Sequence, residues 1–116
     1  MLIDAHVHLA SNHLFNRLVW EGAGREKRVG WIRALLKEYK KQGIYVLRDG
    51  GDAIFASKLA REIAAEEGMI YRSPIFALYK KNRYGSFLGK PIRDLEDFKK
   101  EFKILLEHKP DHLKII

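Results

Sequence analysis

The sequence predicts an α/β fold in which strands and helices alternate in the order β-α-β-α-β-α-β. Two observations predict it: short apolar runs have the composition of strands, and the segments between them carry apolar residues at helical spacing. Strands that are joined by helices are normally parallel, because the chain must cross back over the sheet before it pairs again. A chain of 116 residues is long enough for one domain with a hydrophobic core, and we expect one domain over residues 1–116.

The first half of the chain supplies two predicted strands and one predicted helix. Residues 2–7, LIDAHV, form a short apolar run that predicts a strand, and residues 44–48, IYVLR, are rich in residues that favour strands. Between them, residues 26–43 predict a helix that ends at Gly43. Its apolar positions recur at helical spacing: Val29, Ile32, Leu36 and Tyr39, with Trp31 and Leu35 beside them.

A second helix is predicted over residues 52–68, with Asp52 as its N-cap and Gly68 as its end. Its buried face is expected to contain Ile54, Phe55, Leu59 and Ile63. Residues 69–77 predict the third strand. Pro74 either weakens the middle of this strand or marks its exit, because proline cannot donate a backbone hydrogen bond.

The last helix is predicted over residues 94–108, with Asp94 as its N-cap, and residues 112–116, HLKII, predict a fourth strand. The helix has an apolar side made of Leu95, Phe98, Phe102, Leu105 and Leu106. Two connections, residues 9–26 and 78–93, are longer than the others. Both follow the C-terminal end of a predicted strand, which is the edge where parallel α/β folds bind ligands.

The composition narrows the class of protein. The chain has no cysteine, which rules out disulfides and thiolate metal sites and suits a reducing cytoplasm. We expect a cytoplasmic protein without a membrane partner, because we find neither a signal peptide nor an apolar stretch of membrane-spanning length. The net charge is +7, but the charges are spread over helix faces, which favours an ordinary charged surface and makes nucleic acid an unlikely partner.

Three polar residues interrupt the first strand and its end: Asp4, His6 and His8. Because alternate residues of a strand point to the same side, we expect all three on one face. The helices then cover the other face, which is Ile3, Ala5 and Val7. Two imidazoles on one face need a partner, and a divalent metal ion satisfies both. An accidental His-x-His pair is the alternative, but its place at the C-terminal end of the strand favours a metal. Asp4 is expected to hydrogen-bond locally rather than bind metal.

The segment LIDAHVHL resembles the first-strand metal motif of the amidohydrolase superfamily, which are metal-dependent hydrolases built on a (β/α)8 barrel. Two more segments resemble that family in the same order. Residues 42–52, QGIYVLRDGGD, are similar to its second strand, and residues 109–116, KPDHLKII, are similar to its fourth. The resemblance covers four of the eight strands, so it implies a partial (β/α)8 TIM barrel, a parallel half-barrel.

The resemblance also implies roles for three residues. His6 and His8 match the first-strand histidines that bind one metal ion, and Lys114 matches a fourth-strand lysine that many members carboxylate to bridge two metals. A lysine ammonium only donates, whereas a carbamate supplies two anionic oxygens. The implied cofactor is one or two divalent ions, zinc first, with Mn, Fe or Ni as alternatives. Strand alternation points Lys114 inward and Leu113 and Ile115 toward the helices; a lysine that extends from a strand end into solvent is the other interpretation.

Further residues are expected near this site. Arg48 and Asp49 either form a tight turn with the glycines that follow them or contact the substrate directly. His13, in the first long connection, is a candidate substrate contact. His108 and His112 are expected at the surface, near a helix end and a strand start. The basic and aromatic residues of the second long connection favour a lid over a pocket, with nucleic-acid stacking as the alternative.

This chain accounts for only half of such a barrel, since a complete barrel takes roughly 250 residues. In the family, further metal histidines lie on strands five and six, and the aspartate that acts as general base lies on strand eight. We therefore expect a fragment, inactive alone, that associates with a C-terminal half or with itself. In the intact barrel, the expected reaction is hydrolysis of an amide, lactone, cyclic imide or ester-like bond of a small-molecule substrate by metal-activated water.

Two other functions stay open at this point. A related metal-dependent nuclease or phosphohydrolase would make use of the basic charge, although such relatives usually carry Glu rather than Lys on the fourth strand. A non-catalytic half-barrel that serves as an interaction module would be consistent with the ligands that this chain lacks.

Overall fold

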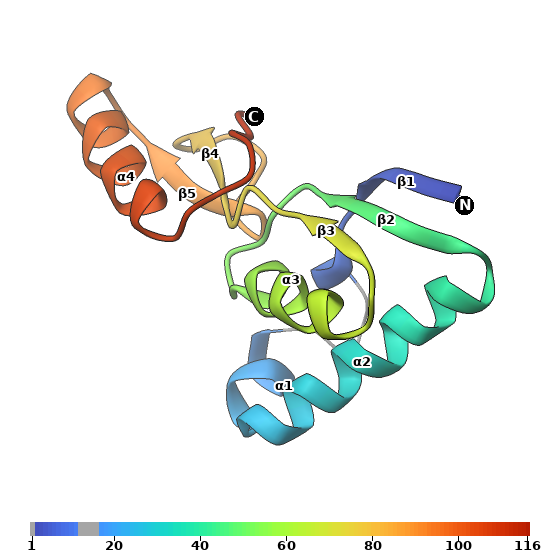
Figure 1. The fold of residues 1–116 in the computed structure, drawn as a ribbon. Helices are drawn as coiled ribbons and strands as arrows, with labels where there is room; N and C mark the ends of the chain where they lie inside the picture. The colour runs from blue at the N-terminus through green and yellow to red at the C-terminus, as the bar shows by residue number, and fades with distance from the viewer. Residues whose placement is uncertain (1, 12–16) are drawn as a thin grey trace.

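The computed structural model describes residues 2–11 and 17–116. Within them, no helix has both the length and the apolar character needed to span a bilayer. Figure 1 shows the elements in chain order: β1 (Leu2–Val7), η1 (Leu9–Ser11), α1 (Arg17–Gly22), α2 (Arg25–Lys41), β2 (Ile44–Asp49), α3 (Ala56–Glu66), β3 (Ile70–Arg72), β4 (Ala77–Lys80), β5 (Gly89–Ile92) and α4 (Leu95–Glu107).

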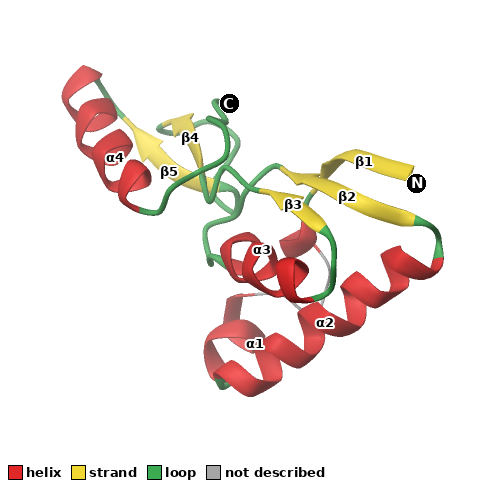
Figure 2. Ribbon diagram, in the orientation of Figure 1, coloured by secondary structure: helices red, strands yellow, loops and turns green. Residues whose placement is uncertain are grey.

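Three parallel strands form the first sheet, in the order β1-β2-β3. Helices α2 and α3 lie together on one side of this sheet, and the opposite side carries no helix of the described chain (Figure 2). The amphipathic pattern of the two helices explains the packing, because their apolar sides meet the sheet. The core between these layers contains Ile32, Leu36, Leu47, Ala60, Ile63 and Tyr71.

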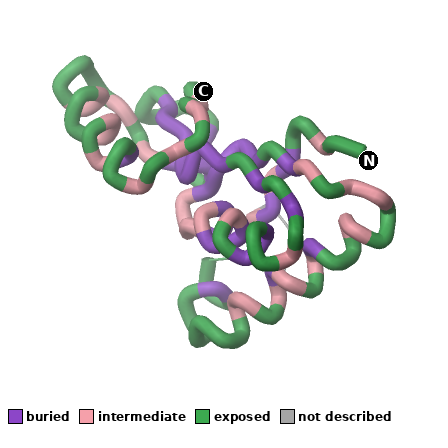
Figure 3. Tube along the Cα trace, in the orientation of Figure 1, coloured by how far each residue is buried: buried purple, intermediate pink, exposed green. Residues whose placement is uncertain are grey.

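Two parallel strands, β4 and β5, form a second sheet beside α4. A separate apolar cluster fills this part, and its fully buried members are Ile75, Phe76, Leu78 and Leu105. Figure 3 shows that the buried residues gather where the two parts meet, while the far turns of α4 and the start of β1 are exposed. The molecule therefore has two small hydrophobic cores, which lie next to each other where the two parts meet.

The second half of β1 departs from the regular alternation predicted for it. Three residue steps from Asp4 to Val7 on β1 match two steps from Leu47 to Asp49 on β2. One strand thus has an extra residue, as in a β-bulge, which redirects side chains. Of the apolar residues expected under the helices, only Val7 is buried; the prediction is wrong for the two exposed ones, Ile3 and Ala5.

The strand predicted over residues 69–77 is interrupted. β3 ends before Pro74, and the chain turns there because Ile75 adopts a left-handed backbone with φ 68°. The chain resumes an extended course only in β4. Pro74 therefore marks the exit of a strand, which is one of the two interpretations that its position in the sequence left open.

Both long connections contain regular structure that was not predicted. The connection over residues 9–26 includes η1 and α1, and the connection over residues 78–93 includes β5. Gly89 allows β5 to pair with β4, because a β-carbon at this position would lie 1.7 Å from the carbonyl oxygen of Ala77. Of the described residues, none between 81 and 88 lines the cleft described below, so the lid expectation finds no support in the structure.

Residues 112–116 do not form a full strand. They make one parallel bridge, between Leu78 and Ile115, in which the Leu78 N–H donates to the Lys114 carbonyl and the Ile116 N–H donates to the Leu78 carbonyl, both at 2.9 Å. The α/β class and the parallel pairing are thus confirmed. The described strands nevertheless lie in two small sheets, and they close no barrel.

The two predicted N-caps have different outcomes. Asp94 caps α4 as predicted, and its Oδ1 accepts a first-turn N–H at 2.9 Å. Asp52 is not the N-cap of α3, because the helix begins later, after Phe55 in a left-handed conformation with φ 63°. The Asp52 carboxylate still accepts the N–H groups of Ala56 and Ser57, each at 2.8 Å, so it satisfies first-turn donors from further back in the chain.

Candidate functional site

His6 and His8 lie at the C-terminal end of β1, and their rings converge. The two Nε2 atoms are 3.0 Å apart, with the ring planes at 63°. Without a metal, this contact is a hydrogen bond in which one Nε2 carries the proton and the other accepts it. Two nitrogens that bind one zinc ion at roughly 2.0–2.1 Å are at most about 4.2 Å apart. The two nitrogens are therefore close enough to share one ion, and a tetrahedral zinc ion would hold them slightly farther apart, at about 3.3 Å.

Gly50 provides the surface on which His8 packs. A β-carbon at this position would lie 2.0 Å from Cε1 of the His8 ring, far inside van der Waals contact. The Gly50 N–H also donates to the carbonyl oxygen of Val7 at 2.8 Å, which ties the end of β2 to the end of β1. The absence of a side chain at residue 50 thus lets the His8 ring lie directly against the backbone that follows β2.

Asp49 joins the ends of the three strands of the first sheet. Its carboxylate is 1% exposed. One oxygen accepts the Gly51 N–H at 2.6 Å, and the other accepts the Leu9 N–H at 3.0 Å and the Tyr71 hydroxyl. Burial, together with the Asp49 charge, raises the pKa of Tyr71 well above its usual range, so the phenol stays a donor. Asp49 thus has a structural role in the turn that follows β2. Its neighbour Arg48, by contrast, is exposed.

A cleft of about 150 Å³ opens beside His6, at the C-terminal ends of β1 and β2. Three segments that are far apart in the sequence line it: β1, the end of β2 and the C-terminal segment. The lining residues are Ala5, His6, Arg48, Asp49, Gly50, His112, Leu113 and Lys114. The fold therefore brings together four of the residues that the sequence singled out: His6, Arg48, Asp49 and Lys114.

Lys114 is half-buried at this cleft, but its neighbours do not lie as strand alternation predicts. Leu113 lines the same cleft and is exposed, and Ile115 is 63% exposed. The prediction that these two residues face helices is wrong. The physical reason is that the segment makes one isolated bridge instead of a strand held between a sheet and a layer of helices.

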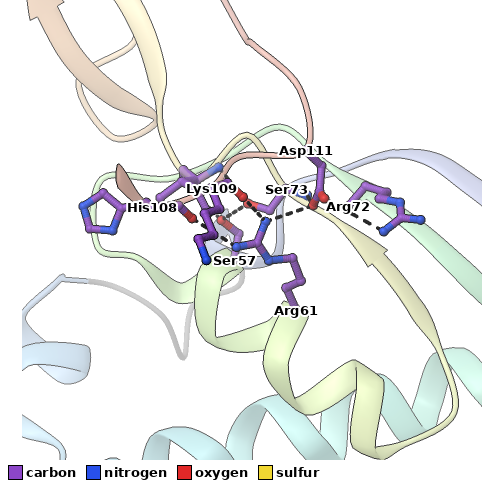
Figure 4. A network of polar contacts seen from close by, with 8 residues as sticks. Ser57, Arg61, Arg72, Ser73, His108, Lys109 and Asp111 are labelled. Atoms are coloured by element: carbon purple, nitrogen blue, oxygen red, sulfur yellow. Dashed lines mark hydrogen bonds and ion pairs between the residues drawn. The ribbon is translucent and has the colours of Figure 1, made fainter. Parts of the chain in front are cut away.

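A network of polar contacts holds the C-terminal segment against β3 and α3 (Figure 4). Asp111 is its centre: one carboxylate oxygen accepts the Ser73 N–H at 2.8 Å and the Arg61 guanidinium at 3.1 Å, and the Asp111 N–H donates to the Ser73 carbonyl at 2.9 Å. Arg61 also donates to two backbone carbonyls just after α4. The network anchors the chain immediately before the residues of this segment that line the cleft.

His112 was not predicted as a site residue, because its place near a strand start indicated the surface. This side chain is half-buried and lines the cleft. Burial, followed by the nearby Arg48 charge, lowers the pKa of His112, and a hydrogen bond with the Asp49 backbone acts in the opposite direction. The signal that was available is the spacing: His112 and Lys114 are two residues apart, the same spacing that drew attention to His6 and His8.

The other candidate residues lie elsewhere. His108 follows the end of α4 as expected, but it is packed rather than at the surface, with its ring 5.1 Å from that of Phe55 and its Nδ1 2.8 Å from the Lys58 ammonium. Burial and the Lys58 charge lower the pKa of His108. Asp4 hydrogen-bonds locally, as expected, through the N–H of residue 6 at 3.2 Å. His13 lies outside the described residues.

Within residues 2–11 and 17–116, no three side chains of His, Cys, Asp or Glu are grouped so as to hold a metal ion, so the histidine pair is an incomplete metal site by itself. A complete site would need further ligands beyond these two imidazoles. Comparison of the chain with family models, with curated proteins and with solved structures found no match in any of the three.

Proposed function

We propose that this chain is the metal-binding, N-terminal half of a metal-dependent hydrolase of the amidohydrolase type, in which His6 and His8 bind one divalent ion. The observation that carries the proposal is the 3.0 Å approach of the two Nε2 atoms at the C-terminal end of a parallel strand. Ligand sites of parallel α/β proteins lie at this edge. The spacing and the place of the pair both fit a metal site better than an accidental His-x-His.

The chain's own residues have separate tasks in this proposal. His6 and His8 donate neutral imidazole nitrogens, which suit zinc first and also Mn, Fe or Ni. Gly50 holds the His8 ring against the β2 turn. Lys114 lines the cleft beside His6 and, once carboxylated, offers two anionic oxygens toward a second ion.

The bound ion would supply a water molecule acidified to near-neutral pKa and a Lewis acid for the substrate carbonyl. The cleft residues around it would orient the bond that is cleaved: an amide, lactone, cyclic imide or ester-like bond. No residue of this chain is assigned as general base, so we assign hydrolysis to the intact barrel and metal binding to this chain. With two protein ligands, we expect weak binding of one ion by the chain alone.

The test is a titration of zinc, and separately of manganese, into the purified chain and into the double variant His6→Ala/His8→Ala, followed by calorimetry. We expect the double variant to lose the saturable binding of one ion. His108→Gln is the matched control, since His108 contacts Lys58 away from the cleft, and it should bind zinc as the wild type does. Identical zinc curves for the wild type and the double variant would remove the pair from the site and end the proposal.

A further inference from the structure

The cleft beside His6 collects positive charge that has no carboxylate partner. Arg48 and Lys114 both line it, and neither forms an ion pair with any residue of the described chain. Several other cations do pair with carboxylates: Arg33, Lys40, Arg61 and Arg93. Two cations without ion-pair partners that line one concave site produce a positive field there, because the walls of a cleft focus it.

The one acidic residue in the cleft lining, Asp49, forms an ion pair with neither cation, and its single charge offsets only part of the charge of the two. The Asp49 carboxylate is buried, and its two oxygens accept the N–H groups of Gly51 and Leu9 and the hydroxyl of Tyr71. The His112 ring also lines the cleft. The charged and titratable groups near this ring are Arg48, Asp49, Asp111, His6 and Lys114.

We propose that the cleft binds an oxyanion group, a carboxylate or a phosphate, held by Arg48 and Lys114, with His112 in the cleft wall beside them. A guanidinium suits this task because its planar fork matches the oxygens of either group. The volume of about 150 Å³ is smaller than the roughly 300 Å³ of the smallest typical ligand pockets, so it suits one charged group of a larger molecule. This anion site uses the free Lys114 ammonium, so it belongs to the chain with uncarboxylated Lys114 and does not rest on the proposed function.

The test uses the metal-free chain, with inorganic phosphate in one arm and acetate in the other, at constant ionic strength. Nuclear magnetic resonance follows the Arg48 Nε–H and the His112 ring. We expect saturable shifts of both groups with at least one anion. Phosphate alone, acetate alone or both would each support the proposal and identify the preferred group.

Arg48→Gln and, as a second variant, Lys114→Gln should each weaken anion binding roughly tenfold, because a charge-assisted hydrogen bond is lost. Arg72→Gln is the matched control. Arg72 pairs in register with Arg48 on the neighbouring strand and is exposed, but it does not line the cleft, so its loss should change binding less than about twofold at constant salt.

Two results would overturn the proposal: neither anion shifts Arg48 and His112 saturably, or all three variants weaken binding equally, as a general effect of surface charge would. The outcome is separate from the metal test, because no metal is present. A chain that binds phosphate but not zinc would refute the proposed function alone, and the reverse result would refute the anion site alone.

Discussion

His8 owes its position to a neighbour that has no side chain. Its ring lies on the backbone of Gly50, where any β-carbon would collide with it at 2.0 Å. The next residues of the turn, by contrast, are organised by hydrogen bonds to the buried Asp49 carboxylate. One turn therefore serves two purposes at the scale of single residues: it ties the strand ends together and orients a candidate metal ligand.

Gly50→Ala should displace the His8 ring and weaken zinc binding by roughly ten- to a hundredfold, the range seen when groups that support metal ligands are removed. Calorimetric zinc titration of the variant checks this. If the ring cannot move away, the variant should instead lose about 1–3 kcal/mol of stability through overpacking.

Gly30→Ala serves as the control for this prediction. Gly30 lies within α2 with no atom within 4 Å of its added β-carbon, so alanine should raise helix stability by about 0.5–1 kcal/mol and leave zinc binding unchanged. Wild-type zinc affinity together with wild-type stability in Gly50→Ala would show that the His8 ring does not depend on this contact.

At the scale of elements, α3 shows how a helix can be capped from a distance. The residue before its first turn, Phe55, has no capping side chain, and the chain from Asp52 to Phe55 curls so that the Asp52 carboxylate meets the first-turn N–H groups. Asp52 is fully buried, and burial is the largest cause that raises its pKa from 3.8 to about 6. The helix start is therefore sensitive to pH.

Asp52→Asn should remove one pH dependence of stability. The folded state binds the Asp52 proton more tightly than the unfolded chain does, so the ionised carboxylate costs stability above about pH 6, and this cost is relieved as the pH falls toward 3.8. Relative to Asp52→Asn, the free energy of unfolding of the wild type should rise by about 1.4 kcal/mol for each unit by which the pH falls across that window. Urea unfolding at several pH values measures the difference.

Asp97→Asn is the control for the pH measurement. The Arg93 guanidinium lowers the pKa of Asp97 to about 2, so this carboxylate is ionised in the folded and the unfolded chain above about pH 5. The difference between the wild type and Asp97→Asn should then be flat from about pH 5 to 7. A difference between the wild type and Asp52→Asn that is equally flat over the window of Asp52 would contradict the prediction.

At the scale of the whole molecule, the site depends on how two small cores are joined. The first sheet provides His6 and Arg48, whereas the C-terminal segment provides His112 and Lys114. That segment is held by one bridge to β4 and by the polar network around Asp111 (Figure 4). The cleft therefore exists only while these contacts hold the end of the chain beside β1 and β2.

Asp111→Ala should cost about 1–3 kcal/mol of stability, because the Ser73 N–H loses its acceptor. It should also release the segment, so that the amide protons of Leu78 and Ile116, which form the bridge, exchange faster with solvent. Asp111→Asn keeps an oxygen for Ser73 and loses the charge toward Arg61 and Arg72, and it should cost less than about 1 kcal/mol. Equal stability and equal exchange in the two variants would show that Ser73 does not depend on Asp111.

The sequence alone determined most of the local structure. Period-two and helical patterns located β1, β2, α2, α3 and α4, because these patterns are set by which side of each element meets the core. The Asp94 cap was also predictable, because a capping aspartate acts within a single helical turn. The convergence of His6 and His8 followed from their separation of two residues on an extended chain.

Only the tertiary structure decided what surrounds the histidine pair. The extra residue in β1, the break at Pro74 and the single bridge at Ile115 all override the regular alternation that the local pattern predicts. His112 and Lys114 line the same cleft as His6 because segments that are far apart in the chain pack together. Such contacts depend on the packing of whole elements and on non-local hydrogen bonds. Neither of these produces a periodic pattern in the sequence.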